Sequence, residues 1–132
     1  MRLTVSNFIA LAFGAIVLTG CVKDAKEELV SQGAVPLTQA EVLDHVSDKT
    51  EVWTKGAGYY GPGGDLRWTW EGDSGSGRWA VKDDGRLCMV VQEWGGTDIC
   101  HAYVLHEGEI TLVFEGDARV AETRPGNQLS AL

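Results

Sequence analysis

The sequence predicts a mainly β protein with a minor α component: one N-terminal helix packed on an antiparallel meander of six or seven strands that curls into a sheet or partial barrel. Two hairpin signals near the middle of the chain, a cysteine pair that fits them, and short β-prone runs separated by tight turns support this prediction. Curling is expected because it would hide the unpaired edges of the sheet. At 132 residues the chain is long enough for one domain with a single core.

A helix is predicted at residues 39–46. Thr38 and Glu41 have the spacing of a capping box, and Leu37 precedes the cap where it can pack on Val42 as a hydrophobic staple. The apolar residues of this segment form one short stripe, so the helix is expected to cover one side of the sheet.

Two strands are expected next. The first covers residues 50–55, and the glycines of residues 56–58 are expected to interrupt it. The second covers residues 65–71 and has three large apolar residues on one face: Leu66, Trp68 and Trp70. The Gly/Ser-rich segment 72–77 is expected to be a flexible connector.

The central hairpins give the strongest local signal. The pair Asp84-Gly85 lies between two β-prone runs, which predicts a two-residue turn that pairs residues 78–82 with residues 86–92. A second turn around Trp94 would complete a three-stranded unit. Its more apolar face is assigned to the core and contains Leu87, Met89, Val91, Ile99, Tyr103 and Leu105.

The register of the second hairpin predicts a disulfide. With Trp94 at its centre, Cys88 lies directly opposite Cys100 and both thiols point to one face, at a separation that a disulfide needs. The spacing fits neither a redox motif nor a paired zinc knuckle. A bridge closing so short a loop contributes roughly 2–4 kcal/mol.

The last strands are expected at residues 109–115 and 118–123, with glycine-containing turns before each. Residues 125–132 are expected to form a frayed tail after Pro125. The antiparallel domain with its helix would therefore cover residues 37–124.

The N-terminus reads as an export signal. Residues 1–20 have a basic start at Arg2 and an apolar run shorter than the ~20 residues of a spanning helix, which is typical of a signal peptide. The tetrapeptide Leu18-Thr19-Gly20-Cys21 resembles the lipobox of bacterial lipoproteins, in which the cysteine receives a diacylglyceryl group. That resemblance implies lipidation at Cys21, a membrane partner through this anchor, and a tether over residues 21–36. Val22, in place of aspartate, implies delivery to the outer membrane, facing the periplasm.

Charge and composition exclude some classes of partner. The net charge is −8, and the mature chain loses Arg2, which leaves it at −9. Nucleic acid is therefore not an expected partner, because no basic stripe is present to neutralise phosphates.

No catalytic, metal-binding or cofactor-binding motif is recognised. His101 and His106 would face opposite sides of one strand, so they cannot chelate one ion. Ser74 and Ser76 do not form a nucleophile elbow. We therefore predict no catalytic residue, no metal and no cofactor.

The aromatic residues are the best candidates for ligand binding. Aromatic side chains on one face of a sheet can stack on sugars or hold apolar ligands in the mouth of a barrel, although the tryptophans could also simply fill the core. The candidate ligand-binding residues are Tyr59, Tyr60, Trp68, Trp70, Trp94 and His101.

These elements together resemble a bacterial family of small exported proteins and lipoproteins, the domain-of-unknown-function family nine-nine-five. The matching pieces are Lys49-Thr50, Trp53, the segment 56–60, Gly77-Arg78-Trp79-Ala80-Val81, Gly85-Arg86-Leu87-Cys88 and Ile99-Cys100-His101. The resemblance implies a β domain in the cell envelope and no assigned reaction. Trp53-Thr54-Lys55-Gly56 is also similar to a short motif of membrane-bound lysozyme inhibitors.

We therefore expect a non-enzymatic, outer-membrane-anchored periplasmic lipoprotein that acts as a small binding or interaction module for a small molecule or an envelope protein. The alternative is a small cell-envelope hydrolase, and a further alternative is a lysozyme-inhibitor-like protein. A titratable group with a strongly shifted pKa in a cleft would favour the enzyme.

Overall fold

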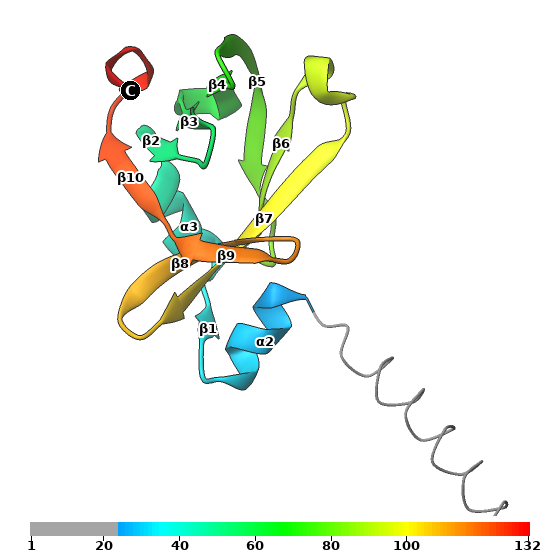
Figure 1. Ribbon diagram of the computed structural model, residues 1–132, viewed down its shortest axis with the longest axis vertical. Coiled ribbons are helices and arrows are strands. Elements are labelled where there is room, and N and C mark those ends of the chain that lie inside the picture. The colour runs from blue at the N-terminus through cyan, green and yellow to red at the C-terminus, as the bar shows by residue number, and fades with distance from the viewer. Residues whose placement is uncertain (1–23) are drawn as a thin grey trace, which may run out of the picture.

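The computed structural model describes residues 24–132, which form ten antiparallel strands in a nearly closed barrel, together with two α-helices (Figure 1). The mainly β architecture is confirmed, while the predicted six or seven strands were too few. The strands are β1 (Val35–Pro36), β2 (Lys49–Val52), β3 (Gly56–Tyr60), β4 (Asp65–Trp70), β5 (Asp73–Val81), β6 (Leu87–Val90), β7 (Asp98–His106), β8 (Glu109–Phe114), β9 (Asp117–Val120) and β10 (Glu122–Pro125). The helices are α2 (Ala25–Ser31) and α3 (Gln39–Val46), and short 3-10 turns cover η1 (Pro62–Gly64), η2 (Gln92–Trp94) and η3 (Leu129–Ala131).

The barrel closes through one bent C-terminal segment. From β2 to β9 each strand pairs with its neighbour in sequence, and β10 returns to pair with β2. Only Ala121 separates β9 from β10, and its N–H donates to the carbonyl of Ile110 on β8 at 2.9 Å. The first half of this segment therefore pairs with β8 and the second half with β2, so one bent segment joins the two ends of the strand order and nearly closes the barrel. A single strand had been predicted here at residues 118–123.

Helix α3 begins and ends as the sequence predicts. The Thr38 hydroxyl accepts a hydrogen bond from the Glu41 N–H at 3.2 Å, and the Glu41 carboxylate accepts one from the Thr38 N–H at 2.9 Å, which completes the capping box. Val42 and Val46 are fully buried in the main hydrophobic cluster, so the apolar stripe of the helix packs into the barrel interior.

The second central hairpin has the predicted register, and Cys88 and Cys100 form a disulfide with an S–S distance of 2.06 Å. The first does not, because Ala80 lies opposite Cys88, one residue away from the pairing that a two-residue turn at Asp84-Gly85 implies. The prediction of a two-residue turn in the first of these hairpins is wrong. The Lys82 N–H donates to the Arg86 carbonyl at 2.8 Å, so the loop contains the three residues 83–85, and Gly85 has a φ of 86°. A left-handed glycine after a tight turn is the usual way to close a three-residue hairpin.

Two glycine-rich segments that were predicted as breaks are strands. Gly56 opens β3, where a Cβ would lie 1.9 Å from the Thr69 carbonyl oxygen of β4. Gly75 lies inside β5, where a Cβ would lie 2.6 Å from the ring of Trp68. The glycines therefore reflect close approach of neighbouring groups within the sheet and not flexibility.

The segment expected as a tether packs on the outside of the barrel in its described part. Helix α2 places Ala25 and Leu29 against Val104 and Val113, and β1 pairs with β7. Helix α2 and β1 therefore cover part of the outer face of the sheet at β7, the strand that contains Cys100. Leu105, which had been assigned to the core, is 46% exposed because it lies close to the β7–β8 turn.

The C-terminal tail is also bound and not frayed. The Thr50 hydroxyl donates to the Gly126 carbonyl at 2.7 Å and accepts from the Gln128 N–H at 2.9 Å. These hydrogen bonds fix the chain after β10 against β2.

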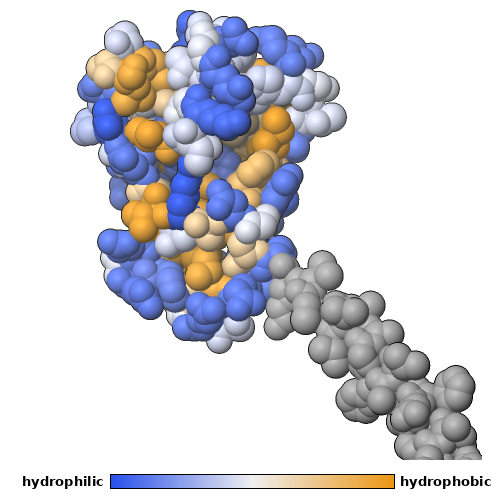
Figure 2. Space-filling view, in the orientation of Figure 1, coloured by the Kyte–Doolittle hydropathy of each residue, from blue (hydrophilic) through white to orange (hydrophobic). Residues whose placement is uncertain are grey.

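Figure 2 shows a mostly hydrophilic face on which hydrophobic residues gather in a few separate groups. Within residues 24–132, no helix has both the length and the apolar character that crossing a membrane requires. The predicted signal peptide and the predicted lipidation site Cys21 lie outside the described residues.

Candidate ligand-binding site

A cavity of about 380 Å³ lies inside the barrel and opens to solvent beside the tryptophans. Its volume is within the range of small-molecule sites, which are concave and mostly apolar with a few polar groups. The lining residues are Trp53, Thr54, Trp70, Met89, Trp94, Ile99, His101, Leu112, Phe114, Asp117 and Arg119.

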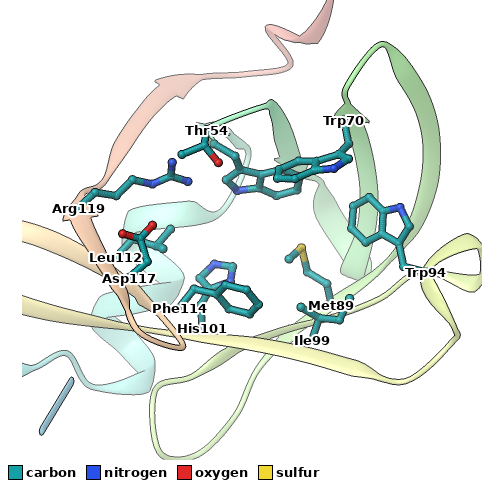
Figure 3. A pocket seen from close by; sticks show the side chains of 11 residues that line it. Thr54, Trp70, Met89, Trp94, Ile99, His101, Leu112, Phe114, Asp117 and Arg119 are labelled. Carbon is teal, nitrogen blue, oxygen red and sulfur yellow. The ribbon is translucent and has the colours of Figure 1, made fainter. Parts of the chain in front are cut away.

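One wall of the cavity consists of indole rings. Trp53, which follows β2, lies 6.3 Å from Trp70 and 6.5 Å from Trp94 between ring centroids, in tilted and edge-on arrangements. Trp94 also packs on Trp68 at 4.6 Å. Figure 3 shows Trp70 and Trp94 facing the cavity from the same side. Tilted aromatic contacts of this kind hold the rings in place and leave their free faces available for a ligand.

Aliphatic residues from neighbouring strands form the floor. Met89 of β6 and Ile99 of β7 are directly paired across the sheet, so their side chains share the inner face (Figure 3). Leu112 of β8 is buried, and Phe114, at the end of the same strand, is 38% exposed at the rim. The cavity is therefore apolar over most of its surface.

His101 adds a polar group to the deep part of the cavity. Its side chain is almost fully buried, and Nε2 lies 3.0 Å from the Tyr103 hydroxyl oxygen and 3.4 Å from Glu51 Oε1. The Tyr103 hydroxyl donates its only hydrogen to Glu51 Oε2 at 2.6 Å. Tyr103 must therefore accept from His101, which places a hydrogen on Nε2 of the imidazole.

Glu51 is the centre of this network and is completely buried. Besides Tyr103, its carboxylate accepts hydrogen bonds from the Tyr60 hydroxyl at 2.9 Å and the Trp53 indole N–H at 3.1 Å. Burial alone raises the pKa of Glu51, but hydrogen bonds and the electrostatic effect of the neighbouring His101 outweigh it, so that the pKa lies below its ordinary value. A buried carboxylate with this many donors is ionised at neutral pH.

The tyrosines and a second histidine support the same network. Burial and the negative charge of Glu51 raise the pKa of Tyr60 and of Tyr103 well above the ordinary value, so both hydroxyls remain donors. His45 of α3 packs edge-on against Tyr103 at 5.4 Å. Its Nε2 is buried without a hydrogen-bond partner, and burial lowers the pKa of the imidazole. His45 is therefore neutral and acts as a packing residue.

Three polar residues lie at the mouth of the cavity: Thr54, Asp117 and Arg119. Arg119 is directly opposite Leu112 in the β8–β9 ladder, so both side chains lie on the inner face. Figure 3 shows Arg119 extending from β9 toward Thr54, with Asp117 on the same side of the mouth.

The structure separates the six candidate ligand-binding residues into four groups. Trp70, Trp94 and His101 line the cavity as candidates should, and Trp68 is buried behind Trp94. Tyr60 belongs to the Glu51 network and does not reach the cavity. Tyr59 lies on the outer face, where its hydroxyl donates to Asp48, because adjacent strand residues point to opposite sides.

Sequence reasoning missed Glu51 altogether. It stands in the short strand β2 between Thr50 and Val52, and no spacing distinguishes it from a solvated glutamate. Met89 and Ile99 had been assigned to the core and lie on its border with the cavity. Arg119 and Phe114 had not been considered, because barrel closure alone brings β8 and β9 opposite the tryptophans.

The cavity lining contains few reactive side chains. Among the cavity-lining residues Thr54 is the only one with a hydroxyl group, and neither cysteine, serine nor lysine is present. Within residues 24–132 no group of three histidine, cysteine or acidic side chains is placed to hold a metal ion.

A family model described as "Protein of unknown function (DUF995)" matches residues 15–105. The match includes the indole wall, Met89 and Ile99 of the floor, and His101, and it ends before β8 and β9. The searches of curated proteins and of solved structures gave no match.

Proposed function

The chain belongs to the family of proteins of unknown function DUF995, and from this premise we propose that its barrel binds a small, largely apolar molecule in the cavity beside the tryptophans. The observation that carries this proposal is the cavity itself, which joins three indole rings, an aliphatic floor and one buried histidine. Binding of an apolar molecule in a cavity of this size would be favoured by the removal of its apolar surface from water, at roughly 25 cal/mol per Å² before the entropic cost of binding.

The Glu51 network supports a binding role because it makes the site rigid. Fully hydrogen-bonded buried polar groups favour one arrangement of their surroundings, and this network joins β2, β3 and β7 through Glu51, Tyr60 and Tyr103. A site that is already ordered loses less conformational entropy when a ligand binds.

The alternative of a cell-envelope hydrolase has less support. The cavity lining offers no serine or cysteine nucleophile, and the hydroxyl group beside His101, that of Tyr103, already donates its hydrogen to Glu51. The lysozyme-inhibitor alternative also has less support, because Trp53 of the similar motif is turned inward against Trp70 and donates to Glu51.

Filling the cavity is expected to abolish binding of an apolar probe. We predict that wild-type protein binds the neutral dye N-phenylnaphthylamine with increased dye fluorescence, and that Met89→Trp weakens this binding about tenfold or more because the larger side chain occupies the site. Val120→Trp is the matched control, since Val120 is 56% exposed and does not line the cavity. Equal binding by both variants, or no binding by the wild type, would contradict the proposal.

We also propose that the protein is an outer-membrane lipoprotein with its domain in the periplasm. The lipobox-like tetrapeptide ending at Cys21 supports this, and the disulfide between Cys88 and Cys100 fits an oxidising compartment. An acylated N-terminus would hold the barrel close to a bilayer, where apolar molecules are concentrated.

Lipidation predicts a specific labelling result. Cells that express the full chain are expected to incorporate radiolabelled palmitate into it, and Cys21→Ala should lose the label and leave the membrane fraction. Cys88→Ser combined with Cys100→Ser is the control that should keep the label, because these thiols form the disulfide. Persistent labelling of Cys21→Ala would rule out this anchor site.

A further inference from the structure

Arg119 differs from the other arginines in the described part of the chain. Arg67 and Arg86 pair with Asp65 and Asp84, Arg124 pairs with Glu122, and Arg78 donates to the Gly63 carbonyl. Arg119 is the one arginine of residues 24–132 whose side chain makes no hydrogen bond or ion pair with another residue of this range, although it is half-buried. A guanidinium with five donors in this position is an unused binding group.

The surroundings of Arg119 define what it can bind. Leu112 lies directly opposite it on β8, and the indole wall lies across the mouth of the cavity. In so apolar an environment a charge-assisted hydrogen bond is stronger than in water, and the planar guanidinium matches a carboxylate with two parallel bonds. An anionic group here would be joined to an apolar body that fills the cavity.

Asp117 is the negative group nearest to this position in the sequence, and it lines the same mouth. It pairs with Phe114 across the ladder, is exposed, and forms no ion pair with Arg119. Its charge is therefore hydrated and screened by salt, whereas the guanidinium is partly shielded from water. His101 is the other ionisable side chain in the lining, and its Nε2 is already directed at Tyr103 and Glu51.

We propose that the cavity binds an amphiphilic carboxylate, such as a fatty acid, with the carboxylate on the Arg119 guanidinium and the hydrocarbon chain between the indole wall and the pair Met89 and Ile99. This inference rests on the proposed binding function and names its ligand class. Arg119 selects the head group, and the apolar lining supplies most of the affinity.

The experiment is a displacement series with N-phenylnaphthylamine on the periplasmically produced domain from Val22 onward, near neutral pH. Three competitors share one hydrocarbon chain and differ in the head group: decanoate, decanol and decyltrimethylammonium. Decanoate is expected to displace the dye at the lowest concentration. Arg119→Gln should weaken decanoate about tenfold, which corresponds to one charge-assisted pair, and leave decanol within about twofold.

Two further variants keep the result interpretable. Arg119→Lys should retain part of the preference for decanoate, because it keeps the charge but loses the fork. Asp117→Asn should tighten decanoate slightly by removing a like charge, a change that a general loss of folding would not produce.

The outcomes separate this inference from the proposed function. Equal displacement by decanoate and decanol overturns the role of Arg119 and leaves the apolar site intact. Strongest displacement by decyltrimethylammonium overturns it in favour of Asp117. If the wild type binds neither dye nor any competitor, the binding function and the ligand class both fail.

Discussion

Replacing Glu51 with glutamine is expected to lower the free energy of unfolding by about 3 kcal/mol or more. The carboxylate accepts from Trp53, Tyr60 and Tyr103, and His101 Nε2 lies 3.4 Å away. An amide of the same shape offers one acceptor oxygen and adds two donors, so buried donors would face each other. Urea unfolding followed by tryptophan fluorescence measures the change.

Glu71→Gln is the matched control for this substitution. Glu71 pairs with Lys55 at 3.5 Å on the surface, where both side chains are more than half exposed, so its loss should change stability by well under 1 kcal/mol. If Glu51→Gln changed the free energy of unfolding as little as this control does, the network would not contribute to the stability of the barrel.

The same substitution should flatten the acid limb of the stability curve. The pKa of Glu51 is lower in the folded protein than in the unfolded chain, because hydrogen bonds and His101 favour the charged form. Its contribution is therefore present above the unfolded pKa and is lost as the pH falls through the folded pKa. The difference in the free energy of unfolding between wild type and Glu51→Gln should therefore become smaller as the pH falls below the ordinary pKa of glutamate.

Replacing Gly56 with alanine is expected to destabilise the protein by about 3 kcal/mol, at the upper end of the usual effect of overpacking. A Cβ at this position would lie 1.9 Å from the Thr69 carbonyl oxygen and 2.9 Å from the Cα of Trp70. Both atoms belong to the backbone of β4, so no side-chain rotation can relieve the clash. Strand β3 would have to move away from β4, and chemical denaturation would detect the change.

Gly116→Ala provides the comparison, because a Cβ there meets no atom within 4 Å. It is expected to be nearly neutral. The Gly56 substitution should also weaken dye binding, since Trp70 lies directly opposite Gly56 and lines the cavity. Equal stability of the two variants would mean that the pairing of β3 with β4 tolerates a side chain at Gly56.

The local elements could be predicted from sequence because each depends on neighbours in the chain. The capping box of α3 needs only Thr38 and Glu41, and the pairing of Cys88 with Cys100 follows from one turn centred on Trp94. The alternation of side chains along a strand was enough to predict that Trp68 and Trp70 share a face. In these places short-range geometry determines the outcome, and the structure confirms it.

The cavity could be predicted only in part. Trp70, Trp94 and His101 were recognised as candidates and line the cavity. Trp70 was chosen because it shares a strand face with Trp68, and Trp94 because aromatic residues beside turns commonly form the rims of sites. Tyr59 and Tyr60 were adjacent candidates, yet one points outward and the other into the core. Which of two alternating residues faces the inside depends on the register with β2 and β4, and this was not evident from a segment that contains three glycines within residues 56–61.

By itself the sequence determined the mainly β class, helix α3, the register of the hairpin centred on Trp94 and the disulfide, because hydrogen bonds and side-chain contacts between residues close in the chain specify them. Only the tertiary structure decided that Gly56 and Gly75 lie inside strands, that Glu51 is buried among Tyr60, Tyr103 and His101, and that Arg119 faces the tryptophans. The physical reason is barrel closure. The bend between β9 and β10 joins β8 to β2, and this single long-range event creates both the buried network and the cavity.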